Sequence, residues 1–241
     1  RAVIDDELIV SVALLEAAGC EVEVPTLQTC CGQPAFNSGD MLDARAIARQ
    51  VIESFEAFDF VVAPSGSCAG MLREHYASLF DAEPAWQQRA GELASRTREL
   101  LSFLHDDLRF SVVDASYPAV ATYHDSCSGL RELKIKEQPR ALLAQVEGIE
   151  LQEMLDTDVC CGFGGTFCVK YPEISERMVS DKVANIVATA ADTVLGGDLG
   201  CLLNIAGRLK RLGSPVRVYH AGEVLAGLTD EASIGEPAER L

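Results

Sequence analysis

Two copies of the tripeptide Cys-Cys-Gly, at Cys30–Gly32 and Cys160–Gly162, constrain the fold of this chain more than any other feature. Each copy follows the end of a predicted helix and then a predicted strand. These elements lie within Leu14–Val22 before the first copy and within Leu142–Leu151 before the second. Matched flanks around a repeated motif indicate an internal duplication.

The segments after the two motifs also correspond. Each motif is followed by an amphipathic helix, a short apolar strand and a third cysteine. Thirty-five residues separate Gly32 from Cys68, and 38 separate Gly162 from Cys201. The predicted elements are a helix over Met41–Phe58 and a strand over Phe60–Ala63 in the first copy, and a helix over Pro172–Ala190 and a strand over Thr193–Leu195 in the second.

The sequence therefore predicts an α/β protein made of two tandem, pseudo-symmetric cysteine-rich units with mainly parallel sheets. We expect the first unit, with connecting helices over Pro84–Leu108, to cover residues 1–115, and the second to cover residues 116–241. Cys68 and Cys201 each come just after a predicted strand, and open α/β sheets place their sites at the carboxyl ends of strands.

A further cysteine makes the two units unequal. Cys127 lies 33 positions before Cys160 and follows a predicted strand over Ala119–Tyr123, whereas the corresponding position of the first unit would fall before residue 1. We therefore expect the chain to be truncated at its N-terminus, without the opening strand and first ligand of that unit. The candidate ligands are Cys30, Cys31 and Cys68 in the first unit, and Cys127, Cys160, Cys161 and Cys201 in the second.

The spacing of these cysteines favours metal binding over disulfides. Adjacent cysteines rarely bridge to each other, and clustered thiols of a cytoplasmic protein more often bind metals. Thiolate sites select zinc or iron–sulfur clusters, and structural zinc sites usually show close cysteine pairs. A vicinal pair with distant single cysteines therefore favours an iron–sulfur cluster, and the glycine would let the backbone approach its core. Cys20 is expected to be a small core residue; Cys168, without a counterpart in the first unit, is a weaker candidate ligand.

The charge and motifs of the chain argue against several classes of partner and cofactor. A net charge of −17 argues against nucleic acid as a partner, and no apolar stretch reaches the roughly 18 residues of a membrane span. No Gly-x-Gly-x-x-Gly or phosphate-loop motif predicts a nucleotide cofactor.

His124, three residues before Cys127, is a candidate to donate a hydrogen bond to a cluster sulfur, although a bond to backbone is equally compatible.

Longer blocks of sequence surround these residues, namely Thr29–Gly39, Pro64–Cys68, His124–Cys127, Cys160–Phe167 and Gly200–Ile205. Through these blocks the chain resembles the lactate utilization protein A family along essentially its whole length. More broadly, it resembles the cysteine-rich domain proteins that include the B subunit of heterodisulfide reductase and the iron–sulfur subunit of glycolate oxidase.

The resemblance implies a cytoplasmic subunit that carries clusters of the [4Fe–4S] type and takes part in the oxidation of L-lactate to pyruvate. It also implies two partners, a ferredoxin-like iron–sulfur subunit and a third subunit of a lactate-oxidising complex. Two alternatives stay open, namely thiol–disulfide chemistry at the cluster and a zinc-stabilised scaffold without catalytic activity. The heterodisulfide reductase pattern ends each unit in Cys-x-x-Cys, whereas this chain has Met71 after Cys68 and no second cysteine near Cys201.

Overall fold

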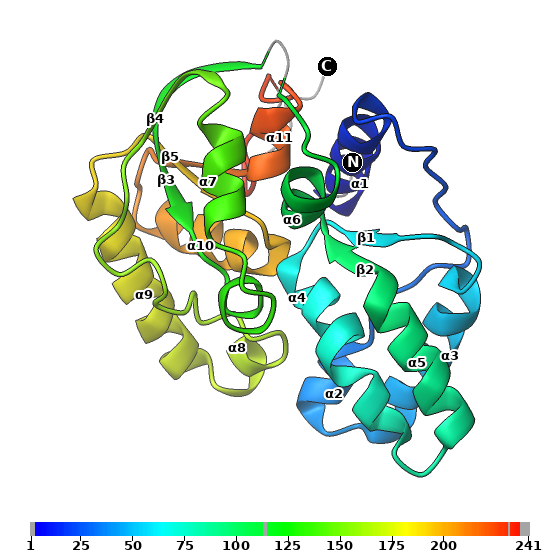
Figure 1. The fold of residues 1–241 in the computed structure, drawn as a ribbon. Helices are drawn as coiled ribbons and strands as arrows, with labels where there is room; N and C mark the ends of the chain where they lie inside the picture. Colours follow the sequence, from blue (N-terminus) through cyan, green and yellow to red (C-terminus); the bar gives the residue numbers. More distant parts are fainter. Residues whose placement is uncertain (1–2, 113–114, 231, 237–241) are drawn as a thin grey trace.

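Two parallel β-sheets organise the chain, and helices pack around both of them (Figure 1). The computed structural model describes residues 3–112, 115–230 and 232–236. The larger sheet has the strand order β4-β3-β5-β6, the smaller pairs β1 with β2, and every pairing is parallel. This arrangement confirms the predicted α/β fold. The strands are β1 (Val61–Ala63), β2 (Thr97–Glu99), β3 (Ser116–His124), β4 (Glu147–Leu151), β5 (Thr193–Gly196) and β6 (Arg217–His220).

The larger sheet is covered on both faces because its side chains alternate along each strand. Val194 and Val218 pack in the core formed with α9 (Pro172–Ala188) and α10 (Leu199–Arg211). The neighbouring Leu195 and Tyr219 pack on the opposite face, in the core that contains residues of α7 and α11 (Figure 1). Helix α7 spans Glu137–Leu143, and helix α11 spans Ala221–Leu225.

Helices of the first unit form a separate core. Helix α3 (Met41–Phe55) begins after Asp40, whose side chain accepts the backbone N–H of Asp43, and it buries Ala44, Ala48, Val51 and Ile52 along one face. The other elements of this region are α2 (Gln33–Ser38), α4 (Gly66–Gly70), η1 (Met71–His75), η2 (Ala77–Phe80) and α5 (Pro84–Arg96).

Two sequence predictions differ from the structure. The segment Cys20–Val22 is predicted as a strand, but it pairs with no described strand, and its Glu21 is exposed. A strand needs hydrogen bonds from a neighbour, and here β1 pairs only with β2. Strand β2 itself lies inside Pro84–Leu108, which was predicted as helices only; the helices flanking it are α5, α6 (Leu100–Ser102) and η3 (Phe103–Asp107).

Helix α1 (Val3–Ala17) packs against α11, which lies late in the chain. Its residues Val10 and Leu14 share a core with Val224 and Leu225 of α11. The N-terminal helix therefore packs against an element of the second unit. The boundary between residues 115 and 116 falls at the first residue of β3 and stays a prediction.

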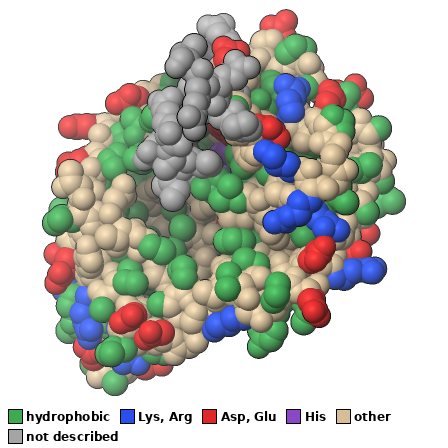
Figure 2. All heavy atoms as spheres, turned by 180° about the vertical axis from the view of Figure 1, so that it is seen from behind, with side chains coloured by type: hydrophobic (Ala, Val, Ile, Leu, Met, Phe, Trp, Pro, Cys, Tyr) green, Lys and Arg blue, Asp and Glu red, His purple; other side chains and the backbone are tan. Residues whose placement is uncertain are grey.

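The surface shows no single dominant feature on the face drawn in Figure 2, where acidic and basic side chains both occur with hydrophobic side chains between them. In the described part of the chain, no helix has the length and apolar character that crossing a membrane requires. The remaining short helices are η4 (Ser128–Glu132) and α8 (Phe167–Lys170).

Candidate metal centre

Four cysteines of the second unit meet beyond the carboxyl ends of its parallel strands. Cys127 follows β3, the pair Cys160 and Cys161 lies on the loop after β4, and Cys201 lies in the first turn of α10. The thiol of Cys127 interacts with that of Cys160, Cys160 with Cys161, and Cys161 with Cys201. The fold thus brings together all four candidate ligands of this unit.

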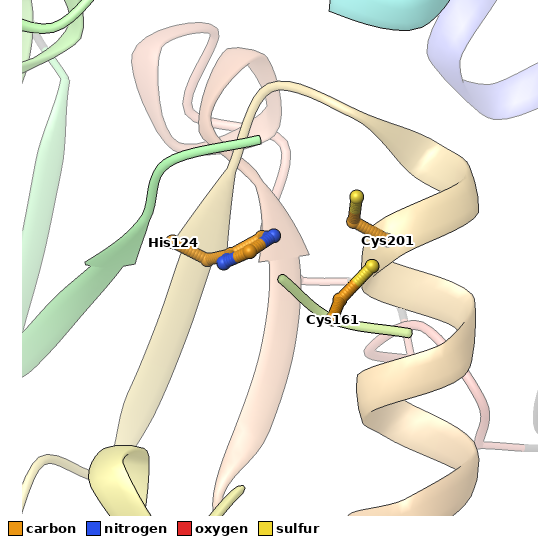
Figure 3. Close-up of side chains that lie close together, drawn as sticks. All are labelled: His124, Cys161 and Cys201. Atoms are coloured by element: carbon orange, nitrogen blue, oxygen red, sulfur yellow. The ribbon is translucent and has the colours of Figure 1, made fainter. Parts of the chain in front are cut away.

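His124, the last residue of β3, faces the same sulfur atoms. A ring nitrogen of His124 and the Sγ atoms of Cys161 and Cys201 all lie within 4.8 Å of one another (Figure 3). The side chain is 1% exposed, and neither ring nitrogen has a hydrogen-bond partner among the described residues. Burial, assisted by the charge of Lys182, lowers the pKa of His124 to about 3, so the ring is neutral and carries one N–H.

The electrostatics of the four thiols fit a bound metal group. Hydrogen bonds from the thiols of Cys127 and Cys161, and from the Gly162 N–H at 3.4 Å, hold the pKa of Cys160 well below its ordinary value. The pKa values of Cys127 and Cys161 are raised, chiefly by their contacts with Cys160. Several thiolates this close together need a cationic group between them. A thiolate set with an unpaired buried N–H suits an iron–sulfur cluster, whose sulfides accept hydrogen bonds.

The glycines of both Cys-Cys-Gly corners shape how these loops pack, while the approach of their backbone to a cluster stays a prediction. Gly32 and Gly162 have φ angles of 80° and 78°, in the left-handed region that favours glycine. A Cβ atom on Gly162 would lie 2.7 Å from the carbonyl oxygen of Ser175 in α9, and one on Gly32 would lie 3.2 Å from Ile47 Cγ2 in α3. Each glycine therefore allows its corner to pack against the following long helix.

The three candidate ligands of the first unit also lie together. The Sγ atoms of Cys31 and Cys68 are 3.5 Å apart, and the exposed Cys30 interacts with Cys31. The hydroxyl of Tyr76 donates to the Cys31 carbonyl at 2.8 Å. In the second unit, the side-chain amide of Asn204 donates to the Cys161 carbonyl at the same distance. Corresponding backbone groups are therefore held in both units by different side chains.

The two remaining cysteines lie apart from these sets. Cys20 is half-buried and packs against the core that contains α1. The thiol of Cys168 donates to the carbonyl of Gly165 at 3.2 Å, and no contact with another sulfur is described for it.

Sequence reasoning missed two residues of the site. Asp198 caps α10 by accepting the N–H of Cys201, and its position three residues before that cysteine is a recognisable capping pattern. Lys182 is fully buried in α9, where the charges of Cys161 and Cys127 act on it, and no local pattern distinguishes it from a surface lysine.

Comparison with known proteins agrees with this geometry. The family model described as "Cysteine-rich domain" (CCG) matches residues 7–73 and 121–206, so that each match contains one Cys-Cys-Gly corner. The chain is 49% identical to lactate utilization protein A of Halalkalibacterium halodurans over 215 residues, which are 89% of this chain and 88% of the relative. It is 50% identical to the proteins of that name from Geobacillus thermodenitrificans and Shouchella clausii, with 89% of this chain and 90% of each relative covered. The chain therefore belongs to the lactate utilization protein A family of cysteine-rich domain proteins.

Proposed function

We propose that this protein is an iron–sulfur electron-transfer subunit that takes part in the oxidation of L-lactate to pyruvate. The observation that carries the proposal is the convergence of Cys127, Cys160, Cys161 and Cys201, with the buried ring of His124 beside Cys161 and Cys201. The substrate class comes from relatives that are about half identical to this chain and are named for lactate utilization.

Each group of the site has a defined task in this proposal. The four cysteines would hold the cluster, and when bound it would supply one-electron transfer. The neutral ring of His124 would donate its N–H to a sulfur of the bound cluster. The backbone N–H groups of Gly162 and Phe163 donate to Cys160 Sγ and Cys161 Sγ at 3.4 and 3.5 Å. Buried Cys161 and Cys201 exclude water on one side, while half-exposed Cys127 and Cys160 leave a side open to a partner.

The stoichiometry of the reaction requires partners. Oxidation of lactate to pyruvate releases two electrons, whereas one cluster of this kind takes up one. We therefore place the protein in a complex with a ferredoxin-like iron–sulfur subunit and a third subunit. The set of Cys30, Cys31 and Cys68 is the candidate site for another centre in this chain.

The metal assignment is tested by purifying the protein without oxygen and measuring iron, acid-labile sulfide and the EPR spectrum after reduction. Cys161→Ser should remove most of the iron bound by the second unit, because it removes a central thiolate. Cys168→Ser is the matched control, since Cys168 bonds only to a carbonyl among the described contacts. A colourless wild-type protein with stoichiometric zinc would overturn the assignment.

The role in lactate oxidation is tested with the partner subunits present. Addition of L-lactate should reduce the wild-type protein, as seen by EPR, and should leave Cys161→Ser unreduced at the second unit. An iron-loaded protein that stays oxidised in the assembled complex would contradict the proposed function. Reoxidation of reduced protein by an organic disulfide would instead indicate thiol–disulfide chemistry.

A further inference from the structure

Lys182 is a fully buried ammonium group beside the second cysteine set. It extends from α9, is 0% exposed, and donates through Nζ to the carbonyl oxygens of Asp156 and Thr157 at 2.9 and 3.0 Å. These carbonyls belong to the loop that leads into Cys160 and Cys161. Burial of a cation is costly unless an anion lies close by, and two neutral carbonyls do not supply one.

The neighbouring carboxylates do not provide this anion. Among the described residues, no carboxylate forms an ion pair with Lys182 within 4.0 Å. Asp125, the strongest charge acting on Lys182, is bound by both terminal nitrogens of Arg140 at 2.9 and 3.0 Å. Asp158 is exposed to solvent, which screens its charge.

The thiols of the second cysteine set are further groups that can carry negative charge near Lys182. Burial lowers the pKa of Lys182 from its ordinary value, and the charges of Asp125, Cys161, Asp158 and Cys127 oppose this shift, in that order. The charge of Lys182 also lowers the pKa of His124, which lies beside Cys161 and Cys201. The packing agrees with these interactions: Lys182 binds the loop that leads into Cys160, and Met178, one helical turn earlier in α9, lies against Gly162 of the same corner.

We infer that Lys182 is the fixed counter-charge of the metal centre in the second unit, and that its ammonium raises the reduction potential of that centre. The inference rests on the proposed iron–sulfur function. Reduction adds an electron to a group that is already negative with four thiolate ligands, and a buried cation favours the added charge because little water screens it.

The first unit shows that the fold does not require a lysine at this position. The corner glycine of the second unit packs against Met178, four residues before Lys182, and the corner glycine of the first unit packs against Ile47. The residue four positions after Ile47 is Val51, which is buried and uncharged. A valine fills the corresponding place, so the charge distinguishes the second site from the first.

If Lys182 had only a structural role, it would fix the loop at Asp156 and Thr157 through its hydrogen bonds. The reduction potential distinguishes this role from an electrostatic one, because hydrogen bonds to the loop alone would leave the potential of an intact cluster unchanged. Lys182→Met removes the charge and the hydrogen bonds, Lys182→Gln keeps an N–H donor without the charge, and Lys182→Arg keeps the charge. Lys170→Met is the matched control, because Lys170 is an exposed lysine on α8, close to the same Cys-Cys-Gly corner.

The experiment is an EPR-monitored redox titration of the intact, iron-loaded protein. We expect Lys182→Met and Lys182→Gln to lower the equilibrium constant for reduction of the cluster at least tenfold, which corresponds to a fall in reduction potential of about 59 mV for a one-electron couple. Lys182→Arg and Lys170→Met should change this equilibrium constant less than threefold. Full iron content with an unchanged potential in Lys182→Gln would overturn the inference, as would an equal fall in Lys170→Met. A zinc-containing wild-type protein would overturn both proposals, whereas a shifted potential without reduction by lactate would overturn only the proposed role in lactate oxidation.

Discussion

The carboxylate of Asp198 accepts the backbone N–H of Ser67 at 2.8 Å, and this bond joins the two cysteine loops. Ser67 precedes Cys68 in the first unit, while the other oxygen of Asp198 accepts the N–H of Cys201 at 3.3 Å. Asp198 is 3% exposed. One buried side chain therefore fixes the positions of a candidate ligand loop from each unit.

Replacement of Asp198 by alanine should destabilise the protein by about 2 to 3 kcal/mol, because two N–H groups lose their acceptor in a largely buried region. Urea denaturation gives the free energy of unfolding. Asp40→Ala is the control, since Asp40 is an exposed cap of α3 that serves one N–H in a single unit, and it should cost about 1 kcal/mol. Equal costs in the two variants would show that the link between the loops adds no stability.

Gly162→Ala should be more damaging than Gly39→Ala, although the two glycines have similar positive φ angles of 78° and 82°. At Gly39 an added Cβ meets nothing within 4 Å, so only backbone strain of about 1 to 2 kcal/mol is expected. At Gly162 the Cβ would also collide with the carbonyl of Ser175, which should add about 1 to 3 kcal/mol. Urea midpoints and bound iron measure both effects; a Gly162 variant no less stable than the Gly39 variant would contradict the packing role.

The sequence predicted the elements with strong periodicity and the grouping of the cysteines. The helix predicted from Met41 is α3, and the one opened by Pro172 is α9. Repeated spacing carries this information because equivalent cysteines follow equivalent strands. Strand β2 was missed because Thr97-Arg98-Glu99 has no apolar alternation and is recognisable only through its pairing with β1.

The buried charges of the site could not be predicted. A lysine on an amphipathic helix normally faces solvent, and the burial of Lys182 depends on a loop about 25 residues earlier in the chain. The partner of Asp198 at Ser67 is likewise a product of how the two units pack. Such contacts between distant segments leave no periodic trace in the sequence.

Glu99 and His220 occupy corresponding places in the two units and should give stability opposite dependences on pH. Each ends the last strand of its sheet and caps the helix that follows. Burial lowers the pKa of His220 to about 4 from 6.5 and raises that of Glu99 to about 7 from 4.5. The neutral forms of both side chains are therefore favoured in the folded protein.

For His220, the stabilisation is fully present above pH 6.5 and is lost as the pH falls toward 4, because only the unfolded state takes up the proton there. The Nδ1 atom of His220 accepts the Gly222 N–H at 3.1 Å, a contact that the protonated ring cannot keep. Relative to wild type, Glu99→Gln should lose about 2 kcal/mol more between pH 7 and 5, because the opposing contribution of Glu99 is gone. Urea denaturation at several pH values measures it, and no added loss in Glu99→Gln relative to wild type would contradict the assignment.

For Glu99, the stabilisation is present below pH 4.5 and is lost as the pH rises toward 7, because the unfolded carboxyl ionises first. Relative to wild type, His220→Asn should therefore lose about 2 kcal/mol between pH 5 and 7, the reverse of the Glu99→Gln result. A wild-type profile in His220→Asn would show that the two residues do not offset each other.

His124→Leu should have different effects on the stability of the metal-free protein and on the reduction potential of the metal-bound protein. Neither buried ring nitrogen of His124 has a hydrogen-bond partner in the described part of the chain, so leucine should leave the free energy of unfolding of the metal-free protein unchanged or increase it by about 1 kcal/mol. With the cluster bound, the variant lacks an N–H donor to sulfur, and its reduction potential should fall. His75→Leu is the control, because His75 contacts Glu132 at 3.4 Å in the helices that follow the cysteines. If His124→Leu destabilises the metal-free protein by 2 kcal/mol or more and leaves the potential unchanged, the ring serves packing and not the metal centre.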